Sequence, residues 1–235
     1  MVTDKLEQMR FMLDKRSRIE AQSEVEACTT FEQYFALGAS RFGLTQRPSE
    51  ISSLISLAKT INPRIVCEIG TQYGGNLFLM GNCLPSVCEV YGVDLYVRNR
   101  EKLRAMLPGV RSLHTLSGSS YSQRIFEQVR AALGDKKIDL LFIDGDHSYE
   151  GAKQDFVLYR SLVAEGGLIG FHDIVPDHKT RFGKVTLGYS GGVPILWERV
   201  ATMFKSHEFI EDPMQDSLGI GVIEHSRSVE LPADL

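Results

Sequence analysis

The sequence has no run of about 20 consecutive apolar residues, the length that a helix needs to cross a bilayer. Charged residues recur throughout its first 18 positions, so these positions do not form the apolar core of a secretory signal peptide. From these two absences we expect a cytoplasmic protein without a membrane span.

Basic residues and cysteines are too few for two further classes of protein. With 26 Lys and Arg against 30 Asp and Glu, the formal net charge is -4, without the basic excess that binds a phosphate backbone. We therefore expect no nucleic-acid partner. The four cysteines show no C-x-x-C spacing, which argues against a disulfide framework and a zinc knuckle and favours reduced thiols.

The chain of 235 residues, 43% of them hydrophobic, is long enough for one substantial core. Residues 1–60 are predicted to form an N-terminal helical extension, with apolar positions at helical spacing in Ile51, Leu54, Ile55 and Ala58. This extension is expected to cover the substrate or to form a dimer contact, and the sequence leaves both alternatives open. Residues 61–235 are predicted to form the catalytic domain.

From Pro63 onward, short apolar runs alternate with amphipathic helical stretches. Apolar runs on both faces are typical of buried parallel strands, and the alternation predicts a Rossmann-like, doubly wound α/β fold. The strands are predicted at 64–69, 90–93, 112–116, 138–143 and 167–171, and the helices at 98–106, 122–133, 149–164 and 195–204. Residues 208–211 and 219–223 are predicted to add an antiparallel C-terminal hairpin, giving a mostly parallel sheet of seven strands.

The first predicted strand ends in a glycine-rich turn, at the edge of the sheet where such folds bind ligands. A dinucleotide site would prefer G-x-G-x-x-G, whereas here Gly70 is followed by Thr71 and Gln72. The carboxylate of Glu68 suits a ligand with a cationic amino group better than a pyrophosphate. The structural alternative is a tight strand-to-helix turn without a ligand.

Asp94 ends the second predicted strand, where related folds present a carboxylate to a ribose hydroxyl. An acid at a strand end is also a common helix cap, so this residue alone leaves both roles open.

These residues resemble the motifs of class I S-adenosylmethionine-dependent methyltransferases. Glu68, Gly70 and Gly74 match the first motif of that family, and Asp94 matches the acid of the second. Where the family often has Gly-Asp after the third strand, at an adenine contact, this chain has Gly118-Ser119. The resemblance implies S-adenosylmethionine as cofactor. The candidate cofactor-binding residues are Glu68, Gly70, Thr71, Gly74, Asp94, Ser119 and Asp144.

Two neighbouring strands of the predicted sheet end in acids and imidazoles. The fourth strand leads into Asp144 and His147, and the fifth into His172-Asp173. If these strands are adjacent, the side chains share one cleft. Asp144, His172 and Asp173 are then candidate ligands for a divalent metal, with carboxylates favouring a hard cation and the imidazole allowing manganese, iron or zinc.

The same residues resemble the metal-dependent O-methyltransferase branch, including catechol O-methyltransferase, the macrolide-sugar O-methyltransferases and the cephalosporin hydroxylase group. The resemblance covers about residues 48–224. It implies Asp144 and the His172-Asp173 pair as ligands of magnesium or manganese, although the family pair is more often two acids or Asp-Asn. It also implies His147 as general base, three positions beyond Asp144. A His that caps the following helix is the structural alternative.

The sequence thus predicts an S-adenosylmethionine-dependent O-methyltransferase, assisted by a divalent metal, that acts on a hydroxyl of a small sugar or natural-product acceptor. Residues 175–192 are expected to be either a substrate lid or a solvated loop. Two alternatives stay open: a metal-dependent hydroxylase of the cephalosporin hydroxylase type, and a cofactor-binding module without catalysis. A homo-oligomer is compatible with the sequence.

Overall fold

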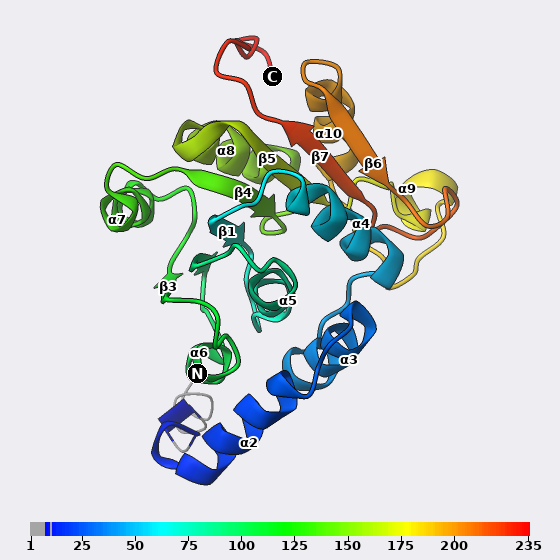
Figure 1. Cartoon of the computed structure of the whole chain (residues 1–235). Coiled ribbons are helices and arrows are strands. Elements are labelled where there is room, and N and C mark those ends of the chain that lie inside the picture. Colours follow the sequence, from blue (N-terminus) through cyan, green and yellow to red (C-terminus); the bar gives the residue numbers. More distant parts are fainter. Residues whose placement is uncertain (1–7, 10) are drawn as a thin grey trace.

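A computed structural model describes residues 8–9 and 11–235 and shows a seven-stranded sheet in the order β3-β2-β1-β4-β5-β7-β6 (Figure 1). Neighbouring strands from β3 to β5 are parallel, whereas β7 runs antiparallel to both β5 and β6. The predicted mostly parallel sheet with an antiparallel C-terminal hairpin is confirmed. The strands are β1 (Ile65–Ile69), β2 (Glu89–Asp94), β3 (Ser112–Ser117), β4 (Ile138–Ile143), β5 (Val163–His172), β6 (Ser206–Phe209) and β7 (Ile220–Glu224).

Helices cover both faces of the sheet. One apolar core contains residues of α2, α3, α4, α5 and α6, and the other contains residues of α7, α8 and α10. The helices on the first face are α2 (Lys15–Glu26), α3 (Phe31–Phe42), α4 (Pro48–Lys59), α5 (Gly75–Cys83) and α6 (Arg100–Ala105). Those on the second face are α7 (Gln123–Leu133), α8 (Tyr149–Tyr159) and α10 (Val193–Ala201), while α9 (His178–Phe182) lies in the segment after β5.

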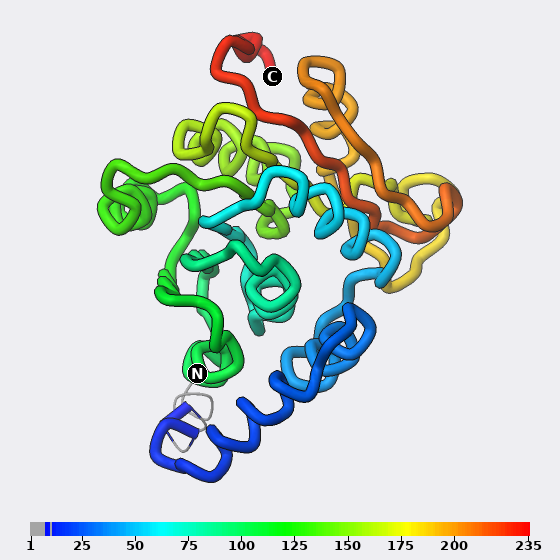
Figure 2. Tube along the Cα trace, in the orientation of Figure 1, coloured from blue at the N-terminus to red at the C-terminus, as the bar shows by residue number. Residues whose placement is uncertain are grey.

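The N-terminal helices are joined to this core in different ways. The apolar stripe predicted for α4 is buried against the sheet, with Leu54 and Ala58 at 0% exposure. Helices α2 and α3 lie further from the sheet, with α3 packed against α5 and α2 against α6, as the blue part of the trace shows (Figure 2). Residues 1–7 and 10 of the predicted extension lie outside the described residues.

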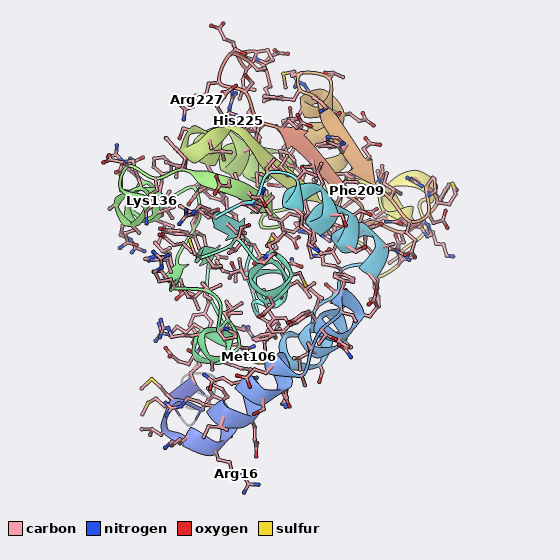
Figure 3. All side chains as sticks on the ribbon, viewed as in Figure 1. Arg16, Met106, Lys136, Phe209, His225 and Arg227 are labelled. Atoms are coloured by element: carbon pink, nitrogen blue, oxygen red, sulfur yellow. The ribbon has the colours of Figure 1, made fainter. Side chains whose placement is uncertain are left out.

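Strand β1 shows how the sequence sorts side chains between the two faces. Ile65, Cys67 and Ile69 belong to the core under α7 and α8, whereas Val66 belongs to the core under α4 and α5. Because side chains alternate along a strand, Glu68 lies on the same side as Val66. Charged side chains such as Arg16, Lys136 and Arg227 lie at the periphery (Figure 3).

Several element boundaries differ from the predicted ones. The helix predicted at 149–164 ends at Tyr159, continues as the 3-10 turn η1 (Arg160–Leu162), and β5 begins at Val163. Val163 pairs with Ile138 of β4 and so belongs to the sheet and not to the helix. Between Val163 and Leu168 the β4–β5 register shifts, and Gly166 has a φ of +74°. Helix α10 spans 193–201 instead of 195–204, because Pro194 suits its first turn. Strand β6 spans 206–209 instead of 208–211.

Two further observations concern the cysteines and the helix lengths of the described residues. All four cysteines are free. Within residues 8–9 and 11–235, no helix combines the length and the apolar character that a bilayer span requires.

Candidate active site

A cavity of about 800 Å³ opens at the carboxyl ends of the parallel strands. Its volume is in the range of small-ligand sites. It lies where β1 and β4 are adjacent and the strand order reverses direction, the usual ligand site of doubly wound sheets. The turns after β1, β2, β3, β4 and β5 all contribute to its lining, as do Leu187 and Tyr189.

The cavity brings together seven of the ten site residues predicted from the sequence: Gly70, Asp94, Ser119, Asp144, His147, His172 and Asp173. Glu68, Thr71 and Gly74 are not among its lining residues. Thr71 is buried below the turn after β1, and Gly74 is the N-cap of α5.

Gly70 is the point where the turns after β1 and β4 touch. Its φ is +88°, and a Cβ placed on it would lie 1.9 Å from the backbone oxygen of Asp144. The backbone N–H of Gly70 donates to the oxygen of Val93 at 2.8 Å, and the N–H of Asp144 donates to that of Ile69 at 2.8 Å. Only glycine allows this approach, which sets the floor of the cavity.

Asp94 faces the cavity beside this turn. Its Oδ2 accepts the backbone N–H of Gln72 at 2.8 Å and its Oδ1 that of Tyr96 at 2.8 Å. A carboxylate has about four acceptor positions, so each oxygen retains capacity for a ligand hydroxyl.

Glu68 is 1% exposed and points toward α5, away from the cavity. Its Oε1 accepts from Nδ2 of Asn76 at 2.9 Å, and its Oε2 is buried without a hydrogen-bond partner. Burial raises the pKa of Glu68 to about 8. The position suits support of the turn more than direct contact with a ligand.

We expect Glu68→Gln to change how stability depends on pH. The folded chain keeps a proton that the unfolded chain loses above its usual pKa of 4.5, so the free energy of unfolding falls as pH rises from 4.5 to about 8. Gln does not titrate, so the variant lacks this loss. The free energy of unfolding of the variant minus that of the wild type should therefore be larger at pH 8 than at pH 5, by at least about 1 kcal/mol, near one pKa unit. Urea unfolding of the ligand-free chain at both values measures this. An equal difference at pH 5 and pH 8 would contradict it.

Two carboxylates and two imidazoles converge after β4 and β5. Nδ1 of His172 lies 3.0 Å from Oδ1 of Asp144 and 3.2 Å from Oδ2 of Asp173. His147 spans the same two oxygens, with Nε2 3.5 Å from Asp144 and Nδ1 3.2 Å from Asp173. Asp146 also lines the cavity, but its Oδ1 accepts the N–H of Ser148 at 2.8 Å within the local turn.

The two imidazoles and the carboxylates stabilise each other's charged forms. The hydrogen bond that His147 donates to Asp144 raises the pKa of His147. Burial alone would raise the pKa of Asp144, but His172 and His147 together hold it well below its usual value. Such a cluster is uncommon as a structural core and typical of a functional site.

The cluster has the donor types of a divalent metal site. One ligand atom each from Asp144, His147 and Asp173 lie within 4.8 Å of one another. The set predicted from the sequence has His172 in place of His147, and both imidazoles reach the same carboxylate oxygens. His172 is 5% exposed, and its Nε2 is buried without a hydrogen-bond partner, so its Nδ1 is the nitrogen that faces the carboxylates.

The segment after β5 packs over His147. Nδ1 of His147 lies 3.1 Å from the backbone oxygen of Tyr189, and the two rings are stacked with centroids 5.9 Å apart. The N–H of Gly192 donates to the backbone oxygen of His147 at 2.7 Å. Asp177 and Ser190 close the base of the segment through three hydrogen bonds.

Three residues contact the cluster or its supports without having been predicted. Nε2 of Gln46 donates to Oδ2 of Asp144 at 3.1 Å, the N–H of Leu218 donates to Oδ1 of Asp173 at 2.6 Å, and Glu50 binds the segment that carries Leu218. The only local signals are the polar residues around Pro48, and these are also typical of an ordinary helix start.

Residues 67–174 match the family model of a methyltransferase domain. Protein R132 of Acanthamoeba polyphaga mimivirus is 34% identical over 113 residues, which are 45% of this chain and 49% of that protein. The chain thus spans about half the length of this relative. Protein y4gI of Sinorhizobium fredii is 25% identical over 176 residues, which are 70% of this chain and 18% of that protein. The domain match confirms the predicted resemblance to methyltransferases.

Solved structures confirm the fold. An O-methyltransferase from Bacillus cereus in complex with SAH superposes with a TM-score of 0.59 at 16% identity, covering 96% of this chain and 98% of that one. The MycE methyltransferase of mycinamycin biosynthesis, in complex with Mg, SAH and mycinamycin VI, gives 0.55 at 14% identity, covering 85% and 57%.

Proposed function

Because residues 67–174 match a methyltransferase domain, we propose that this protein is an S-adenosylmethionine-dependent O-methyltransferase assisted by a divalent metal, magnesium or manganese. The observation that carries the proposal is one cavity with two halves. The turns after β1 and β2 supply Gly70 and Asp94, and the ends of β4 and β5 supply the cluster of carboxylates and imidazoles. A methyl donor and an acceptor hydroxyl can thus meet in one cavity.

The first half of the cavity fits S-adenosylmethionine. Asp94 has acceptor capacity for the ribose hydroxyls, and the close turn at Gly70 leaves room for the ligand beside the backbone. Ser119 lines the cavity where the family resemblance implies an adenine contact. The carboxylates of Asp94, Asp144 and Asp173 make the cavity suitable for a sulfonium cation. The matching Bacillus cereus structure holds SAH.

The second half fits a divalent cation, with Asp144, His172 and Asp173 as the proposed ligands and two carboxylates favouring magnesium or manganese. When bound, the ion supplies Lewis acidity that makes an acceptor hydroxyl easier to deprotonate. His147 takes the proton. In the neutral tautomer that donates Nδ1–H to the Tyr189 oxygen, Nε2 does not donate to Asp144 and keeps the lone pair that a general base needs.

We propose a small hydroxylated sugar or natural product as the acceptor. Leu187 and Tyr189 line the cavity and are 104% and 64% exposed, so they offer an apolar wall to a ligand. This wall supports a role of residues 175–192 in holding the acceptor. The MycE methyltransferase, whose structure contains mycinamycin VI, shares the fold. The matching structures are O-methyltransferases and do not favour the hydroxylase alternative.

Isothermal titration tests the proposal. We expect the wild type to bind SAH, Asp94→Ala to weaken that binding by about 10- to 100-fold through loss of one charge-assisted acceptor, and Asp144→Ala to lose Mn²⁺. Asp135→Ala removes an exposed acid outside the cavity and serves as the matched control. A folded wild type that binds neither SAH nor S-adenosylmethionine would overturn the methyltransferase assignment.

A further inference from the structure

Gln46, in the loop before α4, holds one of the two oxygens of the Asp144 carboxylate. Its Nε2 donates to Oδ2 at 3.1 Å, while Oδ1 faces the imidazoles of His172 and His147. The terminal torsion of an Asp side chain is soft, so its orientation depends on what its oxygens bind. Gln46 therefore fixes the plane in which Oδ1 meets the imidazoles.

Gln46 is buried where it makes this contact. The residue is 6% exposed, and its Oε1 is buried without a hydrogen-bond partner. A buried amide with an unused oxygen is unfavourable for stability alone. Its position next to Asp144 fits a role in the site.

Glu50 lies one helical turn further along the chain and holds a different segment. It is 1% exposed. Its Oε1 accepts from Nε2 of Gln215 at 2.8 Å and from the N–H of Glu211 at 3.1 Å, and its Oε2 accepts the N–H of Gly219 at 3.0 Å. Glu50 thus fixes both ends of the turn between β6 and β7.

That turn supports the second carboxylate of the cluster. Ser217 and Leu218 have φ values of +63° and +64°, a region that side-chain-bearing residues rarely adopt. In this conformation the N–H of Leu218 donates to Oδ1 of Asp173 at 2.6 Å, leaving Oδ2 toward the imidazoles. Because Gly219 follows directly, its bond to Glu50 holds the strained pair in place.

We infer that Gln46 and Glu50 are positioning residues of the metal site, Gln46 acting directly on Asp144 and Glu50 acting on Asp173 through the 217–219 backbone. The inference rests on the proposed metal-assisted function. Two side chains four residues apart thereby couple the start of α4 to both carboxylates. Partners of this kind, which orient metal ligands without binding the metal, commonly change metal affinity by about 10- to 100-fold when removed.

Mn²⁺ affinity, measured without turnover by the electron paramagnetic resonance signal of free Mn²⁺, tests the inference. Gln46→Met keeps length and burial but removes the donor, and Glu50→Gln keeps volume but removes one acceptor. We expect each variant to bind Mn²⁺ about 10-fold more weakly, with SAH affinity unchanged. Ser53→Ala, on the same helix and outside these contacts, is expected to match the wild type.

A merely structural role would lower the melting temperature without a selective loss of Mn²⁺ affinity. Wild-type Mn²⁺ affinity in folded Gln46→Met would overturn the inference for Gln46, and the same result in Glu50→Gln would overturn it for Glu50. A wild type that binds SAH but no Mn²⁺ would overturn the metal site and this inference together, leaving the methyltransferase assignment in place. Absence of SAH binding in the wild type would count against the proposed function itself.

Discussion

Replacing His147 by alanine is expected to lower kcat by about 10²- to 10⁴-fold, the usual contribution of a positioned general base. His147 lines the cavity, its Nε2 lies 3.5 Å from Oδ1 of Asp144, and the Tyr189 oxygen is within reach of its Nδ1. The site proposed for the methyl donor is the other half of the cavity, so the affinity for S-adenosylmethionine should be retained. Transfer of a labelled methyl group to a hydroxylated acceptor measures kcat.

Mn²⁺ binding separates the two roles open to His147, because its donor atom also lies within 4.8 Å of those of Asp144 and Asp173. If His147 is a base, the His147→Ala variant should bind Mn²⁺ as tightly as the wild type. If His147 is a metal ligand, the variant should bind Mn²⁺ more weakly. His207→Ala, on β6 outside the cavity, is the matched control. Undiminished turnover in His147→Ala would refute the base role.

Gly70→Ala is expected to destabilise the fold and to abolish SAH binding. The added Cβ would lie 1.9 Å from the Asp144 oxygen and 2.7 Å from the Gly145 nitrogen, both backbone atoms that cannot rotate away. Together with the left-handed φ of +88°, the clash should cost on the order of 2–5 kcal/mol. For a chain of this size that lowers the melting temperature by roughly 10 °C.

Gly43→Ala isolates the backbone part of this effect. Gly43 also has a left-handed φ, +61°, but nothing lies within 4 Å of its added Cβ. Its cost should therefore stay at about 1–2 kcal/mol, with SAH binding kept. If calorimetry gave the same melting temperature for both variants, the close approach at Gly70 would not be the reason that the site needs glycine.

The site residues that could be predicted from the sequence lie at the carboxyl ends of strands. Gly70, Asp94 and Asp144 directly follow buried apolar strands, and the carboxyl ends of parallel strands meet at one edge of the sheet. Glu68 was predicted as a cofactor ligand, but it lies one residue inside β1 on the α5 side. Glu68 and Gly70 differ because Glu68 lies within the strand, with its side chain bonded to Asn76 of α5, whereas Gly70 lies beyond the strand end, in the turn that lines the cavity.

Long-range contacts account for what the sequence did not predict. Gln46 is 98 positions from Asp144, and Glu50 is 169 from Gly219. No periodicity or motif encodes these two contacts. They arise because the fold places the loop before α4 beside the end of β4, and α4 beside the β6–β7 turn. Similarly, the start of β5 could not be separated from the preceding helix, because apolar residues such as Leu162 and Val163 suit both elements.

The strand order divides the lining of the cavity into two halves that come from different strands. Contacts proposed for the methyl donor come from the turns after β1, β2 and β3, and those proposed for acceptor chemistry come from the ends of β4 and β5 and the loop beyond them. Most of each half comes from one continuous stretch of chain, and the two share a border at Gly70 and Asp144. Under the proposed function, changes in residues 175–192 would alter the acceptor preference and leave the donor half unchanged, so one scaffold could serve different products.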